Sequence, residues 1–72
     1  MTTRELVEKL SPVIRSDIEE IRNDYSNPNV DKSLVRARLS GYTKALESAG
    51  IITERERRML FIYGTVSPLK SR

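Results

Sequence analysis

The 72-residue sequence offers few side chains that could carry out chemistry. It contains no His and no Cys, so the commonest general base, the commonest metal ligand and the thiolate nucleophile are missing. The remaining candidate nucleophiles show no motif with an adjacent base, and the three glycines match no phosphate-binding loop. We therefore predict no catalytic residue, no cofactor, no cofactor-binding residue and no metal ligand, and we expect a protein that is not an enzyme.

Two pairs of carboxylates come closest to an acid–base site. Glu19 is followed directly by Glu20, and Glu54 and Glu56 are separated by one residue. These residues lie among Arg and Lys on expected solvent faces of helices, and Glu54 stands four residues before Arg58, the spacing of a helical ion pair. We interpret the four carboxylates as solvated charges on helix surfaces.

Positive charge is concentrated in the second part of the chain. Residues 1–28 carry six acidic and four basic residues, a net charge of −2, whereas residues 29–72 carry four acidic and nine basic residues, a net charge of +5. A basic surface raises the hypothesis of DNA or RNA binding; the candidate patch consists of Lys44, Arg55, Arg57 and Arg58. Acidic residues lie among these arginines, and no aromatic residue is interleaved to stack on bases. We therefore favour a role of these basic residues in solubility and in pairing with the acidic part.

Hydrophobic spacing predicts an all-α protein. In the first part, apolar residues recur at intervals of three or four, which marks one face of a helix; they are Val7, Leu10, Ile14, Ile18, Ile21 and Tyr25. Thr2 and Glu5 have the spacing of a capping box, and Ser11 before Pro12 is a favoured helix start. We expect a short helix over about 3–10 and a longer one over about 12–25, either separate or joined as one rod kinked at Pro12.

The second part predicts two further helices. The segment Asn27-Pro28-Asn29 reads as a turn, after which a helix over about 30–49 completes a helical hairpin. Its core stripe is Val35, Leu39, Tyr42, Leu46 and Ala49. Gly50 stands just past its end, where a left-handed cap favours glycine. Thr53 and Glu56 form a second capping box and begin a C-terminal helix over about 53–63. We expect residues 64–72 to be a flexible tail and residues 1–72 to form a single small helical domain.

Small residues at every fourth position of the central helix predict how the hairpin packs; they are Ser33, Ala37, Gly41, Ala45 and Ala49. Glycine inside a helix costs about 1 kcal/mol relative to alanine, so close packing at Gly41 is expected to offset that cost. A hairpin centred on residues 27–28 sets bulky residues against this ridge, pairing Ile18 with Ala37, Ile14 with Gly41 and Leu10 with Ala45. The alternative is that the ridge packs between two copies of this helix in a dimer.

The same register sets Asp17 beside Arg38. Each is the one charged residue next to the apolar stripe of its helix, so we predict an ion pair at the edge of the hairpin seam. The alternative is that the two side chains reach water independently.

The most apolar segment lies near the C-terminus and consists of Met59, Leu60, Phe61, Ile62 and Tyr63. These residues cover every face of a helix within about 1.4 turns. A monomer of this length is expected to leave part of that surface uncovered, so we predict it to be the interface with a second copy. The alternative is that residues 64–72 fold back over it, with Val66 and Leu69 against it.

We therefore expect a small protein–protein interaction or regulatory module that acts through an apolar helical surface as a homodimer. The alternative function is a DNA- or RNA-binding regulator that uses the basic C-terminal part. The longest apolar run is far shorter than the about 20 residues that cross a bilayer, and the N-terminus lacks the features of a signal peptide. We expect a cytoplasmic protein with no membrane partner and no evident small-molecule substrate. Its size suits a bacterial, phage or plasmid accessory protein.

Overall fold

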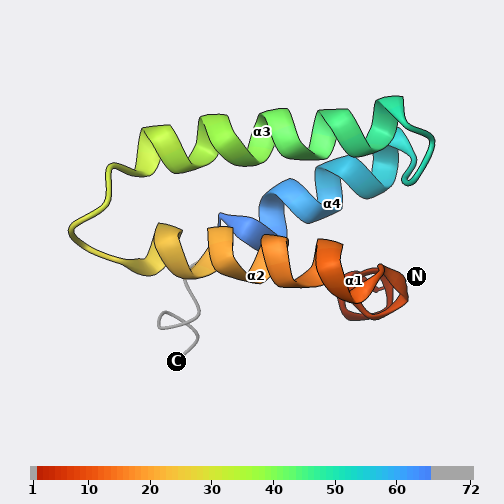
Figure 1. The fold of residues 1–72 in the computed structure, drawn as a ribbon, viewed down its shortest axis with the longest axis horizontal. Helices are drawn as coiled ribbons and strands as arrows, with labels where there is room; N and C mark the ends of the chain where they lie inside the picture. Colours follow the sequence, from red (N-terminus) through yellow and green to blue (C-terminus); the bar gives the residue numbers. More distant parts are fainter. Residues whose placement is uncertain (1, 66–72) are drawn as a thin grey trace.

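The computed structural model describes residues 2–65, which form four α-helices (Figure 1). They are α1 (Thr3–Lys9), α2 (Pro12–Ser26), α3 (Lys32–Ser48) and α4 (Glu54–Gly64). The predicted all-α fold is confirmed, and the helix bounds agree with the expected ones to within about two residues, the usual uncertainty of helix ends. Gly64, expected in the tail, instead ends α4 and is buried; the rest of the tail after Thr65, with Val66 and Leu69, lies outside the described residues. No helix among residues 2–65 is long and apolar enough to span a membrane.

Both predicted capping boxes are confirmed. At α1 the backbone N–H of Glu5 donates to Thr2 Oγ1 at 3.1 Å, and the N–H of Thr2 donates to Glu5 Oε1 at 2.8 Å. At the start of α4 the N–H of Glu56 donates to Thr53 Oγ1 at 3.1 Å, and the N–H of Thr53 donates to Glu56 Oε1 at 2.9 Å. Each box supplies acceptors for amides that have no partner within the helix.

Gly50 ends α3 as the sequence predicts. Its φ angle is 76°, in the left-handed region that glycine adopts without strain. The N–H of Gly50 donates to the carbonyl of Glu47, and the N–H of Ile51 donates to the carbonyl of Leu46, both at 3.0 Å. These two bonds form a Schellman motif and turn the chain toward α4.

The helical conformation is interrupted between α1 and α2. They are two separate helices, so the alternative of one rod kinked at Pro12 is wrong. Leu10 and Ser11 are both extended, with ψ angles of 155° and 154°. Ser11 Oγ accepts a hydrogen bond from the N–H of Ile14 at 3.3 Å, and Pro12 occupies the first turn of α2, where its missing N–H is not needed. Figure 1 shows α1 nearly end-on beside the start of α2, so the two helices point in different directions.

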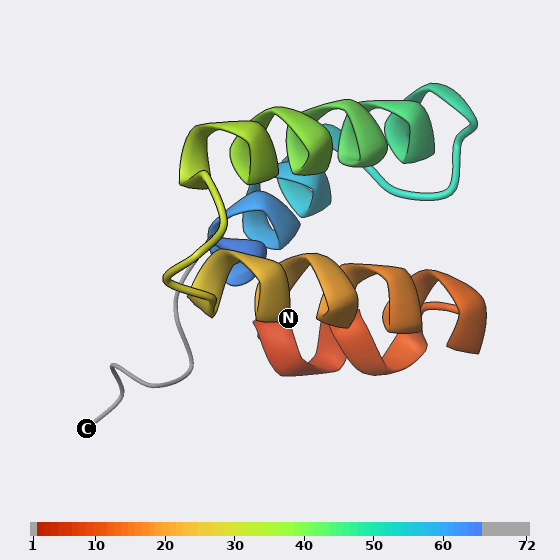
Figure 2. The ribbon, with the colours of Figure 1, turned by 60° about the vertical axis from the view of Figure 1, so that its left-hand side comes forward.

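Helix α4 lies at the centre of the packing. α2 and α3 run antiparallel, and α4 packs against both of them and against α1 (Figures 1 and 2). The core has two clusters. The first comprises Leu6, Val7, Leu10, Leu46, Ile52 and Leu60. The second comprises Ile18, Ile21, Val35 and Leu39. Side chains of α4 enter both clusters, so this helix joins them.

The hairpin turn is longer than expected, and its register differs from the predicted one. Residues 27–31 connect α2 to α3, and Asp31 caps α3 by accepting a hydrogen bond from the N–H of Ser33 at 2.9 Å. The centre of the turn therefore lies near Asn29 rather than at residues 27–28. This displacement changes which residues of α2 and α3 lie opposite one another.

The predicted Asp17–Arg38 ion pair is wrong for that reason. Arg38 Nη1 lies 3.0 Å from Asp24 Oδ2, whereas Asp17 Oδ2 accepts a hydrogen bond from the Tyr42 hydroxyl at 2.8 Å. Both partners lie further along their helices than a hairpin centred on residues 27–28 would place them.

The small-residue ridge of α3 faces solvent, so the predicted seam is also wrong. Ala37, Gly41, Ala45 and Ala49 are exposed, and a Cβ atom added at Gly41 would meet no atom of the described residues within 4 Å. The predicted opposites Ile14, Ile18 and Leu10 pack elsewhere in the two clusters. The reason is that α4 occupies the inner side of the hairpin and draws the opposite face of α3 inward.

The glycine that permits close packing is Gly64. A Cβ atom at this position would overlap Cδ2 of Leu39, whose side chain is completely buried. The sequence alone does not show which of Gly41 and Gly64 permits close packing, because that depends on where α4 lies.

Gly64→Ala is expected to lower the free energy of unfolding by about 1–3 kcal/mol, because the added methyl group overpacks the contact with Leu39. Gly41→Ala is expected to raise it by up to about 1 kcal/mol, because alanine is the better helix former and the site is open. Urea unfolding followed by circular dichroism at low micromolar concentration measures both. Equal changes in the two variants would contradict this placement of the glycines.

Candidate interaction surfaces

The apolar segment Met59–Tyr63 lies mostly inside the bundle. Leu60 is completely buried, while Met59, Phe61 and Tyr63 are partly buried and pack against the core clusters. Only Ile62 of the five is exposed, with 63% of its surface accessible. Because α4 has three neighbouring helices, the monomer itself covers most faces of this segment. What stays accessible is chiefly Ile62, with parts of Met59, Phe61 and Tyr63, so the prediction that all five residues form the interface with a second copy does not fit their burial.

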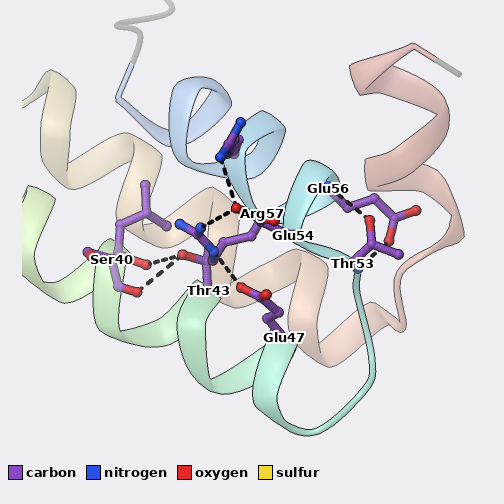
Figure 3. A network of polar contacts seen from close by, with 9 residues as sticks. Ser40, Thr43, Glu47, Thr53, Glu54, Glu56 and Arg57 are labelled. Carbon is purple, nitrogen blue, oxygen red and sulfur yellow. Dashed lines mark hydrogen bonds and ion pairs between the residues drawn. The ribbon is translucent and has the colours of Figure 1, made fainter.

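Two arginines of the predicted nucleic-acid patch are bound to carboxylates. Arg57 Nε lies 2.5 Å from Glu47 Oε1 on α3, and its Nη2 lies 3.9 Å from Glu54 Oε2 (Figure 3). Arg58 Nη2 lies 2.8 Å from Glu54 Oε2, which confirms the ion pair expected from their spacing. The contact with Glu47 ties α4 to α3, and all three contacts neutralise part of the positive charge.

Lys44 and Arg55, the other two members of the patch, are exposed and make no ion pair within residues 2–65. Of the four basic residues in the predicted patch, two are therefore free of ion pairs among residues 2–65. Both are solvated side chains, and neither makes a cation–π contact with a ring in the described part of the chain.

Two tyrosine hydroxyls bind carboxylates of α2 from neighbouring helices. Tyr42 on α3 donates to Asp17, and burial together with this hydrogen bond raises the pKa of Tyr42 to about 12. Tyr63 on α4 donates to Glu19 Oε2 and accepts from Arg22 Nη1 at 3.1 Å. Burial, followed by the contact with Glu19, also raises the pKa of Tyr63. Each bond fixes the position of α2 relative to a second helix.

Thr43 is a buried polar residue whose hydroxyl group is hydrogen-bonded within its own helix. It is 1% exposed, and its Oγ1 donates to the carbonyl oxygens of Leu39 at 2.9 Å and of Ser40 at 3.3 Å (Figure 3). The hydroxyl therefore needs no partner from another helix, and Thr43 serves as a packing residue.

The outer face of α3 is an exposed strip without charge. It begins at Leu34, which is 68% exposed. The residues that follow on the same face are also exposed, and we call the set Leu34, Ala37, Gly41, Ala45 and Ser48 the α3 strip. Intervals of three and four residues place its members on one side of the helix. Arg38 and Lys44 border the strip on opposite edges.

Leu34 was not predicted to belong to an exposed surface, although its spacing in the sequence indicates it. Leu34 stands three residues before Ala37 and therefore continues the small-residue ridge in its first turn. Arg22 and Tyr63 carry no such signal, because 41 residues separate them and only the path of α4 brings them together.

Within residues 2–65 no three His, Cys, Asp or Glu side chains form a group that would hold a metal ion. No protein-family model, no curated protein and no solved structure matches this chain. Its own surfaces are therefore the basis for a functional proposal.

The free energy of unfolding is expected to fall between pH 10 and pH 12. The raised pKa of Tyr42 means that folding favours its protonated hydroxyl, so this contribution is complete below the ordinary value of 10.0 and is lost toward 12. Tyr42→Phe removes the bond to Asp17, and we expect it to lower stability at pH 7 by about 1 kcal/mol and to reduce the alkaline loss. Tyr63 keeps part of that loss because its pKa is raised as well. Urea unfolding at pH 7, 9 and 11 tests this; an unchanged alkaline loss in Tyr42→Phe would contradict it.

Proposed function

We propose that the protein is a small cytoplasmic protein–protein interaction or regulatory module that works as a homodimer, with the α3 strip as its self-association surface. One observation carries the proposal: Leu34 is 68% exposed at one end of an uncharged row of small residues, between Arg38 and Lys44, in a chain of which 32% is charged. Apolar, uncharged surface of this kind is typical of protein contact sites.

The strip is complementary to itself in an antiparallel arrangement. Leu34 stands seven residues before Gly41, and Ser48 stands seven residues after it. A two-fold axis at Gly41 would therefore place Leu34 of each copy over Ala45 and Ser48 of the other. Bulky residues then meet small ones at both ends, and the small residues at the centre let the helix backbones approach closely.

The composition of the strip supports the same arrangement. Gly41 costs about 1 kcal/mol relative to alanine inside a helix, and nothing among residues 2–65 packs against the position of its missing Cβ atom. A close crossing with a second copy would offset that cost. Arg38 and Lys44 border the strip on opposite edges, and Arg38 is paired with Asp24.

The alternative function, a DNA- or RNA-binding regulator, has less support. Arg57 and Arg58 are held by Glu47 and Glu54, so their charge is largely compensated. Binding to a nucleic acid through Lys44 and Arg55 alone would be weak and would fall steeply with salt, whereas association through the α3 strip should tolerate salt.

At high micromolar concentration, light scattering is expected to give twice the monomer mass of 8.3 kDa. Gly41→Glu should restore the monomer mass, because it sets two carboxylates against each other at the crossing. Ser16→Glu, on the exposed side of α2, carries the same charge change and should remain dimeric. A monomeric wild type, or equal loss in both variants, would overturn the proposal.

Cross-linking tests the orientation, since the chain contains no other cysteine. Under mild oxidation Gly41→Cys is expected to form a disulfide-linked dimer, because the two copies meet there. Ser48→Cys should not, because its two copies would lie about 20 Å apart along the helix axes, beyond the reach of a disulfide. Efficient cross-linking of both variants would show a parallel pair instead.

A further inference from the structure

A surface hollow of about 360 Å³ lies where α1, α2 and α4 meet. Its lining consists of Arg4, Val7, Glu8, Arg22 and Tyr63. The volume falls at the lower end of the range for small-molecule sites. No residue of α3 takes part, so the hollow is separate from the α3 strip.

Arg22 is held in place by its neighbours. Its guanidinium carbon lies 4.2 Å from the centre of the Tyr63 ring, a cation–π contact. Its Nη1 donates to the Tyr63 hydroxyl at 3.1 Å and lies 3.8 Å from Glu19 Oε1. Only 24% of the side chain is exposed. The plane of the guanidinium is therefore fixed before any ligand arrives.

One edge of this guanidinium is unused. Its only hydrogen bond within the described residues goes through Nη1, and Nε is buried with no hydrogen-bond partner. Nη2 also has no hydrogen-bond partner among the described residues and, unlike Nε, is not buried, so it is the nitrogen that can donate a charge-assisted hydrogen bond to a carboxylate in the hollow.

The other lining residues narrow the chemistry of the ligand. Arg4 is a second cation, exposed and without an ion pair among residues 2–65. Glu8 offers an acceptor for an ammonium or hydroxyl group, and Val7 with the Tyr63 ring offers apolar contact. Glu8 and Glu19 balance the two arginines, which favours a ligand of low net charge over phosphate.

We propose that this hollow binds a small 2-amino or 2-hydroxy carboxylic acid with an apolar side chain. The carboxylate binds Arg22 and Arg4, and the 2-substituent donates to Glu8. The apolar side chain packs against Val7 and the Tyr63 ring.

The test is a titration of the ¹⁵N-labelled protein with leucine and with 2-hydroxy-4-methylpentanoate, followed by amide chemical shifts. At least one of them is expected to shift amides around residues 4–8, 22 and 63. Leucinamide, which lacks the carboxylate, should cause no such shifts, and 4-methylpentanoate, which lacks the 2-substituent, should bind more weakly. Absence of shifts with both acids, shifts confined to other regions, or tighter binding of inorganic phosphate would overturn the proposal.

Substitutions in the hollow test which residues bind the ligand. Arg4→Gln is expected to raise the dissociation constant about tenfold by removing a charged hydrogen-bond donor, and its exposed position leaves the fold intact. Arg22→Gln should weaken binding at least as much; its circular dichroism spectrum shows whether the loss of the Tyr63 contact has disturbed the fold. Arg55→Gln, an exposed arginine outside the hollow, is the matched control and should bind as the wild type does. Equal affinity of Arg4→Gln and Arg55→Gln would contradict the assignment.

Discussion

The close approach of α4 to α3 at Gly64 is the constraint on which the rest of the fold depends. Gly64 has no side chain, so the end of α4 can lie directly against the buried Leu39. Four residues earlier, Leu60 enters the other core cluster. One helix thereby connects both clusters, and α1 is held because its apolar residues pack around Leu60 rather than along α2. Three neighbouring helices also explain why Met59, Leu60, Phe61 and Tyr63 are apolar, whereas Ile62 faces solvent.

The helices could be predicted from the sequence because their ends are set by nearby residues. Ser11 and Pro12 start α2, Gly50 ends α3, and Thr53 with Glu56 starts α4. The packing could not be predicted in the same way. The hairpin register depends on Asp31 acting as the cap of α3, and a shift of a few residues moved Arg38 from Asp17 to Asp24.

For the candidate surfaces too, contacts within one helix could be predicted from the sequence and contacts between helices could not. The ion pair between Glu54 and Arg58 depends on spacing within one helix and was predictable, whereas the pairing of Arg57 with Glu47 joins two helices and was not. The small residues of α3 were visible in the sequence, but whether they faced α2 or solvent depended on where α4 lies. The contact of Arg22 with Tyr63 depends on that position as well.

The position of α4 also has a consequence for cooperativity. In many helical proteins one part can open while the remainder keeps its hydrogen bonds, and amide exchange then reports several separate opening reactions. Here detachment of α4 would expose Leu60, leave Leu39 without its neighbour at Gly64 and deprive α1 of the helix on which it packs. Both clusters would lose their link in one event, so the protected amides of α2, α3 and α4 would exchange through a single global opening.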